Sequence, residues 1–494
     1  MPERVRSVAV VGRDAAAWII ALGLARALSR IDVAITIVEL PSVLDRADVY
    51  ATLPSLATLH TLLGLNERAL YTRCVAVPSL GQQFVGWSPS RPPFVHGYDV
   101  ARPAINDVDF VQFWSLARRR GLNVAYEDFS IAAVAARQGR IPDRKRDADA
   151  GGGIAPGYHL DAPSYAALLR EGCVAAGLKV RGSASVRADF AGDQCRAVVL
   201  DDGTRVEADL FIDASGPERV VIGSCPGVEF DRWSSSSDHL VTGSLLPLDP
   251  APAHSRIIAT PEGWLGLFPL QDRTAIAGVV AGDAETKHDA AQRLAAAAGI
   301  RPGEALVVRP FDEGALRRSW LGNCIAVGNA AVAMAPLDAV ELQLVQIALS
   351  NLVAFWPADR DCMIEAAEYD RAVASHVANI RDFQLAHYHL SERPEPFWLQ
   401  ARAAGMPERL AARLRLFEAR GIVPAFEDET FLPQSWAAIL IGHGLVPIDS
   451  DPAVERTPED EQMRKFQRLL HVIAQQVPEM PSVTEYLRAM RDAA

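Results

Sequence analysis

Residues 8–20 read VAVVGRDAAAWII, and this stretch decides the fold that we predict for the 494-residue chain. Its first four residues are all apolar, as in a short strand that is buried on both faces. The glycine that follows leads into a helix with an apolar face at residues 15–29. A second, alternating strand at residues 33–38 ends at Glu39. A strand, a helix and a second strand in this order predict a βαβ unit.

The turn after the first strand matches only part of a dinucleotide-binding fingerprint. That fingerprint needs small residues, because the backbone and the helix N-terminus must approach a pyrophosphate. Its three positions hold Gly12, Asp14 and Ala17, so a carboxylate stands where the diphosphate would bind. We expect Asp14 to cap the amides of Ala16 and Ala17 and to weaken FAD binding. The alternative is an N-cap that serves stability alone.

Three further elements favour a FAD-binding module. Glu39 closes the second strand, where a carboxylate can accept ribose hydroxyls, and the alternative is a solvated glutamate. Apolar strands at residues 210–212 and 325–327 run into the segments DASG and GNAA, which start at Asp213 and Gly328. The predicted cofactor-binding residues are Gly12, Asp14, Ala17, Glu39, Asp213, Gly216, Gly328 and Asn329.

Several longer segments resemble the flavin-dependent tryptophan halogenase family, and the similarity extends over nearly the whole chain. They are residues 12–21, GQQFVGW at 81–87, GYHLD at 157–161 with Tyr165, residues 328–338, FLPQSWAAILIGHGLVP at 431–447, and Met480-Pro481. The resemblance implies an α/β fold, with a FAD-binding Rossmann-like module of the two-lobed flavin monooxygenase/halogenase type and a mainly helical C-terminal region.

The resemblance also implies a domain layout. A FAD-binding lobe is expected over residues 1–340, interleaved with a sheet-containing substrate region at about 80–138 and 218–310. A mainly helical lobe is expected at residues 341–494. In this family, reduced FAD, oxygen and a halide yield a hypohalous acid that a lysine directs onto an aromatic substrate, and a separate flavin reductase supplies the reduced FAD.

The position that matches the family's catalytic lysine is Ser79. A serine hydroxyl has neither the charge nor the nucleophilicity of an amine. The four lysines of the chain all lie far from this segment in sequence: Lys145, Lys179, Lys287 and Lys465. Standard halogenation is therefore expected to be impaired. The alternative is that Ser79 is an ordinary loop serine.

The family's active-site glutamate is matched by Asp338, a shorter carboxylate that can still act as a general base. The halide-binding positions that follow it are matched by Ala339 and Val340. Glu341 begins an apolar helix, where the helix dipole favours an acid by roughly 0.3–1 kcal/mol. We predict a degenerate halide site at Val340 and Glu341, in which Glu341 repels an incoming anion.

The predicted substrate-binding residues are His96, Tyr98, Glu427 and Phe431. His96 and Tyr98 resemble the family's aromatic clamp, and their alternative is a satisfied polar pair under a loop. Glu427 and Phe431 resemble contacts at the far end of the substrate. The family's stacking tryptophan is matched by Leu432, which disfavours an indole pocket. Its W-x-W-x-I-P signature, thought to block monooxygenation, appears as residues 264–269 with glycine at position 266.

Bulk composition excludes several other classes. The net charge of −12 argues against nucleic-acid partners, which need a basic surface. The six cysteines lack metal-ligand spacing, so no metal site is expected and a reducing, cytoplasmic location is predicted. No apolar stretch reaches the roughly 18 residues of a membrane span.

His387 and His389 are predicted to lie on the surface of a polar helix. A homodimer is left open.

Two functions remain open at this point. The first is a flavoprotein oxidoreductase, either a halogenase or a monooxygenase of an aromatic substrate, with Asp338 as its acid or base. The second is a non-catalytic, halogenase-like binding protein that has lost its FAD and halide sites. Asp14, Ser79 and Glu341 all favour the loss of chemistry. A dinucleotide-dependent dehydrogenase is disfavoured, because a second cofactor motif is missing.

Overall fold

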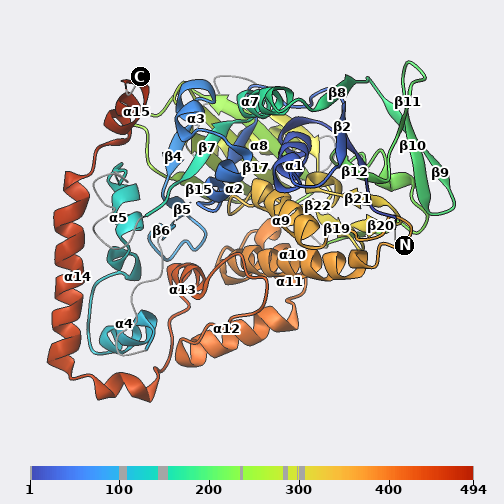
Figure 1. The fold of residues 1–494 in the computed structure, drawn as a ribbon. Helices are drawn as coiled ribbons and strands as arrows, with labels where there is room; N and C mark the ends of the chain where they lie inside the picture. The colour runs from blue at the N-terminus through green and yellow to red at the C-terminus, as the bar shows by residue number, and fades with distance from the viewer. Residues whose placement is uncertain are drawn as a thin grey trace. The chain divides into compact units, whose positions relative to one another are not determined.

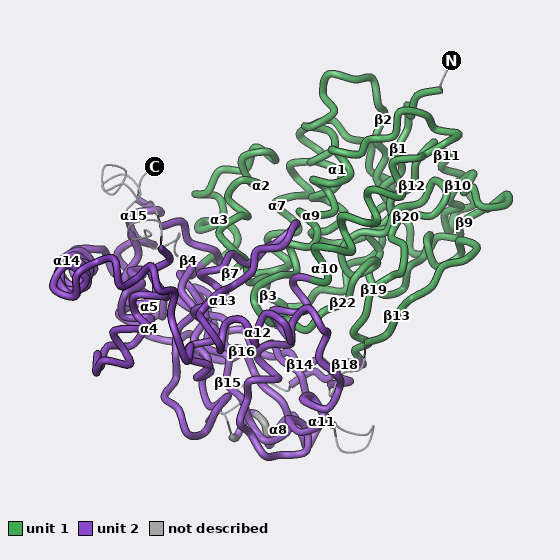
Figure 2. Tube along the Cα trace, turned by 90° about the horizontal axis from the view of Figure 1, so that it is seen from below, with its two compact units in different colours: residues 1–76, 160–234, 311–378 green, residues 77–159, 235–310, 379–494 purple. Residues whose placement is uncertain are grey.

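The computed structural model describes residues 3–98, 108–142, 154–233, 237–281, 287–297, 299 and 306–492. The chain forms two compact units, which Figure 2 colours green and purple. Unit 1 comprises residues 1–76, 160–234 and 311–378, and unit 2 comprises residues 77–159, 235–310 and 379–494. Residues 341–378, which follow the expected FAD-binding lobe, belong to unit 1.

Unit 1 is an α/β unit (Figure 1). Its strands are β1 (Ser7–Gly12), β2 (Ala34–Glu39), β3 (Val49–Ala51), β8 (Lys179–Gly182), β9 (Val186–Ala191), β10 (Gln194–Leu200), β11 (Arg205–Glu207), β12 (Leu210–Ala214), β13 (Phe230–Arg232), β19 (Gly314–Leu316), β20 (Trp320–Leu321), β21 (Cys324–Ala326) and β22 (Val332–Ala333). Its helices are α1 (Asp14–Ala27), α2 (Leu56–Leu63), α3 (Glu67–Arg73), α7 (Ala162–Ala175), α9 (Glu341–Ala354) and the first half of α10 (Glu365–Leu390).

The core of unit 1 is a six-stranded sheet with the order β20-β21-β12-β1-β2-β8. All of its pairs are parallel except β20 with β21. Strand β12 is buried along its whole length and β1 along nearly all of it, which explains their unbroken apolar sequences. Helix α1 packs against α7 and α9. This arrangement confirms the predicted βαβ unit and the Rossmann-like fold class.

The register of this sheet brings the predicted motifs to one edge. At the carboxyl end of β1, Gly12 pairs with Glu39 on one side and with Ala214 on the other. One strand further, Asp213 pairs with Ala326. The turns that follow β1, β12 and β21 therefore lie side by side.

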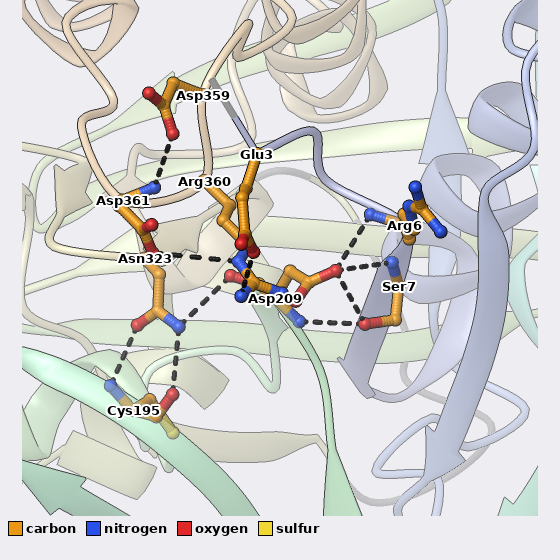
Figure 3. Close-up of polar contacts among 9 residues, drawn as sticks. All are labelled: Glu3, Arg6, Ser7, Cys195, Asp209, Asn323, Asp359, Arg360 and Asp361. Atoms are coloured by element: carbon orange, nitrogen blue, oxygen red, sulfur yellow. Dashed lines mark hydrogen bonds and ion pairs between the residues drawn. The ribbon is translucent and has the colours of Figure 1, made fainter. Parts of the chain in front are cut away.

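The opposite, amino edge of the sheet is held by polar contacts that Figure 3 shows. Asp209 Oδ2 accepts hydrogen bonds from the backbone amides of Arg6 and Ser7, at 2.8 and 3.0 Å, and from the Ser7 hydroxyl at 3.0 Å. Asn323 Nδ2 donates to the carbonyl oxygens of Cys195 at 2.9 Å and Asp209 at 3.2 Å. These bonds join the starts of β1, β12 and β21.

Unit 2 is built around a second sheet (Figure 1). Its strands are β4 (Val77–Ser79), β5 (Gly81–Val85), β6 (Phe94–Gly97), most of β7 (Gly157–Asp161), β14 (His239–Leu245), β15 (Ser255–Thr260), β16 (Gly263–Pro269), β17 (Thr274–Val280) and β18 (Val307–Pro310). Its helices are α4 (Phe110–Arg119), α5 (Ile131–Arg137), α8 (Lys287–Ala297), the second half of α10, α11 (Pro396–Ala403), α12 (Glu408–Arg420), α13 (Pro433–Gly442), α14 (Glu459–Glu479) and α15 (Val483–Asp492).

The seven-stranded sheet of unit 2 has the order β18-β14-β17-β16-β15-β5-β6. Helix α8 covers one face, where Ala291 and Ala295 pack with Leu265 of β16 and Ile276 of β17. The rings of His387 in α10 and of His443, the residue directly after α13, pack on the other face, against Phe84 of β5. None of the described helices combines the length and the apolar character that crossing a membrane requires.

Candidate functional site

The first turn of unit 1 keeps the backbone of a glycine-rich loop. A Cβ atom on Gly12 would lie only 2.4 Å from the carbonyl oxygen of Ala214, so packing alone requires glycine there. Asp14 has φ 56°, a left-handed conformation that glycine adopts freely and other residues rarely. The turn thus combines a position that only glycine fits with a backbone conformation at Asp14 that glycine adopts freely.

The Asp14 side chain does not cap helix α1. Arg13 is the N-cap residue, and its side chain makes no capping hydrogen bond. Asp14 Oδ2 accepts a hydrogen bond from the backbone amide of Val43 at 3.4 Å. The prediction that Asp14 caps Ala16 and Ala17 is therefore wrong, because its carboxylate bonds instead to the segment after β2. Burial raises the pKa of Asp14, and hydrogen bonds from Ser42 and Val43 offset part of this rise.

Tyr50 of β3 is a further residue at this turn, and sequence reasoning missed it. Its buried hydroxyl is hydrogen-bonded to the backbone amide of Ala15, near the start of α1. Burial and the carboxylates of Glu341, Asp14 and Asp48 raise the pKa of Tyr50 well above its usual range. An acidic cluster thus surrounds the start of α1, and its members are too far apart in sequence to form a motif.

Two other predicted cofactor-binding carboxylates are engaged within unit 1. Glu39 forms a bidentate ion pair with Arg170 of α7, at 2.8 and 2.9 Å, so it is not the solvated glutamate of the alternative interpretation. Asp213 is fully buried and accepts four hydrogen bonds, two of them from Ser215 and two from the amides of Val221 and Ile222. Asp213 therefore shapes the loop that contains Gly216.

The segment before α9 contains the predicted general base and halide site. Asp338 is buried, and it and Ala339 have φ 60° and 58°, so two adjacent residues adopt the left-handed conformation. Asn329 Nδ2 donates to the carboxylate of Glu341 at 3.5 Å, which brings the GNAA segment to the start of α9. Burial, with the nearby carboxylates of Asp48 and Asp14, raises the pKa of Glu341 to about 7. Glu341 is thus fully charged only above neutral pH.

Ser79 is the last residue of β4 and not a loop residue. It is 1% exposed, and its hydroxyl donates to the carbonyl oxygen of Gly81 at 3.2 Å. The strand is held by pairing with β7, where Ser79 is opposite Gly157. Ser79 is thus a rigid, buried hydroxyl in place of a long, basic side chain.

Three of the four predicted substrate-binding residues come together in unit 2. The ring of His96 lies 5.9 Å from Tyr98 and 6.4 Å from Phe431. Phe383 of α10, which sequence reasoning did not identify, stacks on Phe431 with centroids 3.8 Å apart. The fourth predicted residue, Glu427, is exposed. The aromatic character of this site therefore comes from β6, α10 and the segment before α13.

Gly266 does not leave open space in the sheet. A Cβ atom there would lie 2.5 Å from the ring of Phe268, two residues along β16. Phe268 therefore fills the volume in which a side chain at position 266 would begin. Trp264, the retained tryptophan of the signature, is fully buried and donates its indole N–H to the Tyr388 hydroxyl at 2.8 Å.

The prediction that His387 is a surface residue is wrong. It is fully buried, its Nδ1 lies 2.8 Å from Nε2 of His443, and its ring stacks on Phe84 at 4.4 Å. Burial lowers the pKa of His387 to about 3, so the imidazole is neutral. A single sequence could not reveal this, because the partner ring of His443 lies 56 residues further along the chain, directly after α13. The described residues contain no cluster of three or more potential metal ligands.

Unit 2 also contains a cavity of about 280 Å³ that the sequence did not predict. Its walls include Phe94, Trp114, Tyr126 and Ile441, with Arg118 among its polar residues. None of the predicted substrate-binding residues lines it. The cavity and the aromatic site share β6, since Phe94, Val95 and Gly97 line the cavity and His96 belongs to the aromatic site.

Comparisons with known proteins agree over the whole chain. The profile of the family described as Tryptophan halogenase matches residues 7–459. A tryptophan 7-halogenase of Kutzneria sp. (strain 744) is 27% identical, with 99% of each chain covered. A flavin-dependent halogenase from Xanthomonas campestris is 29% identical with a TM-score of 0.91, and one from Brevundimonas sp. BAL3 is 27% identical with a TM-score of 0.90, each covering 99% of both chains. These matches confirm the predicted fold class and the family resemblance.

Proposed function

This chain belongs to the tryptophan halogenase family, which is flavin-dependent, and from that premise we propose that it is a FAD-dependent oxidoreductase acting on an aromatic substrate. The proposal further holds that standard halogenation is impaired. A halogenase and a monooxygenase are both compatible with it. Asp338 is the proposed acid or base, because it is a buried carboxylate in the segment that matches the family's active site.

The observation that carries the proposal is the backbone of the first turn. The left-handed φ of Asp14 is strained for an aspartate and natural for the glycine that a pyrophosphate site uses. It lies beside the turns of Gly216 and Gly328, which also have positive φ. The backbone therefore fits FAD. Gly12, Ala17, Gly216, Gly328 and Asn329 are the residues proposed to hold it.

FAD would supply the oxidative chemistry, and the chain would supply binding, orientation and proton transfer. The carboxylate of Asp14 stands close to the proposed diphosphate position and is expected to weaken the affinity. Ser79 offers no cation at the position of the family's lysine. Hydrogen bonding of its hydroxyl to Gly81 further limits its use as a nucleophile.

The cofactor is tested first, by titrating the purified protein with FAD and recording the visible spectrum and flavin fluorescence. The proposal predicts saturable binding that is weak. Complete absence of binding, in the presence or absence of reductant, would overturn the proposal. It would favour the second candidate, a non-catalytic binding protein. The acidic cluster of Asp14, Asp48 and Glu341 around Tyr50 is the observation that favours this candidate.

Impairment of halogenation is tested with Ser79→Lys. The wild-type protein, Ser79→Lys and the control Ser79→Ala are each assayed with a flavin reductase, FAD, oxygen, bromide and a panel of aromatic compounds. Ser79→Lys is expected to raise bromination at least about tenfold over both others, since an ammonium can hold hypohalous acid. Efficient bromination by the wild-type protein would refute the proposed impairment.

A further inference from the structure

A row of polar side chains crosses three strands of unit 2. Gln82 of β5 pairs with Ser255 of β15 on one side and with His96 of β6 on the other. Residues that are opposite each other in a sheet share a face, so the three side chains point the same way. Phe84, two residues after Gln82, is on this face too, and the ring of His387 stacks on it. The row therefore faces the side of the sheet on which α10 packs.

Two members of this row are buried, and their side-chain polar atoms have no hydrogen-bond partner among the described residues. Gln82 is 0% exposed and Ser255 is 1% exposed. Within the described parts of the chain, neither Nε2 nor Oε1 of Gln82 is bonded, and neither is Oγ of Ser255. Buried polar atoms are nearly always bonded, because stripping them of water without replacement is unfavourable. Three such atoms on adjacent strands indicate a place where a ligand completes the bonding.

The surroundings of the row are aromatic. His96, directly opposite Gln82, has its ring 5.7 Å from Phe383 and 6.4 Å from Phe431. Tyr98 packs edge-on against His96 and is only half-buried, so the row is nearest to solvent at this end. A ring held against Phe431 and His96 would have Gln82 as its polar neighbour.

We propose that Gln82 and Ser255 bind a neutral substituent of an aromatic ligand, of the carboxamide class. The Gln82 amide donates through Nε2 and accepts through Oε1, and a carboxamide complements both. Gln82 and Ser255 carry no charge, so a carboxylate or an ammonium on the ligand would lack a counter-charge from them. The identification of this ligand as the substrate rests on the proposed function. The binding of the ligand to Gln82 and Ser255 does not depend on that function.

The test compares three probes that share one ring: benzene, benzamide and benzoate. Their affinities for the full-length protein are measured by ligand-observed NMR or calorimetry, without FAD. Benzamide is expected to bind about tenfold more tightly than the other two, as for one to two buried hydrogen bonds. Gln82→Leu is expected to abolish this preference, and Ser255→Ala to reduce it. Gln83→Leu, on the opposite face of the same strand, is the matched control and should retain it.

A second measurement guards against misfolded variants. In the absence of ligand, Gln82→Leu and Gln82→Met are expected to raise the unfolding temperature, because they remove an unbonded buried amide. A lower unfolding temperature in both, with Gln83→Leu unchanged, would show that the amide is bonded internally and would overturn the inference. An unchanged preference for the carboxamide in Gln82→Leu would also overturn the inference. If the preference is observed but FAD never binds, only the proposed function fails.

Discussion

The two edges of the six-stranded sheet in unit 1 differ in how their polar groups are satisfied. At the amino edge, Asp209 and Asn323 exchange hydrogen bonds with neighbouring strands in ordinary geometry. At the carboxyl edge, Asp14 and Asp338 have left-handed backbones, and burial raises the pKa of Asp14 and of Glu341. The amino edge is built for stability. The carboxyl edge keeps unfavourable features, which is expected where a chain preserves a ligand-binding geometry.

The largest effect on stability is expected from Asp209→Ala, which removes hydrogen bonds at the amino edge. This change leaves the amides of residues 6 and 7 without their acceptor and removes one of the carboxylate partners of the Arg360 guanidinium, at 3.4 Å. Unfolding in urea should show a loss of about 3 kcal/mol. FAD affinity should be unchanged, because the edge lies at the opposite ends of the strands.

Asp359→Ala is the matched control for Asp209→Ala. Asp359 accepts a single exposed hydrogen bond, from the amide of Asp361 at 3.1 Å (Figure 3). Its removal should change the free energy of unfolding by less than about 0.5 kcal/mol. Equal effects of the two substitutions would contradict the role assigned to the amino edge.

A smaller effect is expected from Asp14→Gly at the carboxyl edge. It removes a carboxylate beside the proposed diphosphate position and relieves the left-handed strain, so FAD affinity should rise at least about tenfold. Asp14→Asn keeps the size and hydrogen-bonding shape without the charge, and it should recover part of the gain. FAD titrations of both variants measure this. If neither binds FAD better than the wild-type protein, Asp14 is not the obstacle.

The smallest effect concerns the pH dependence of FAD binding. Since the pKa of Glu341 is raised to about 7, the residue becomes neutral as the pH falls through 7 and charged as it rises. FAD affinity should therefore weaken about threefold between pH 6 and pH 8, because a nearby negative charge appears. Glu341→Gln should remove this contribution. If FAD affinity depends on pH in the same way in the wild-type protein and in Glu341→Gln, the role assigned to Glu341 is refuted.

Most of the fold was predictable from local pattern. Apolar runs in the sequence predicted the strands β1, β12 and β21 and the turns after them. Pairing of these strands places the three turns at a common edge. The absence of a lysine at position 79 was equally visible. Phe383 was not predictable as a neighbour of Phe431, because stacking of the two rings depends on how α10 packs beside the segment before α13.

By itself, the sequence determined the order of the elements and the chemical identity of each predicted site residue, since periodicity and residue type are local properties. The family followed from the resemblance of longer segments to known halogenases. Only the tertiary structure decided the partners of those residues. It placed the Asp14 carboxylate beside the Val43 amide, buried His387 against His443, and left the side-chain polar atoms of Gln82 and Ser255 without a hydrogen-bond partner among the described residues. Hydrogen bonding and burial depend on segments far apart in the chain, and a local pattern does not encode those contacts.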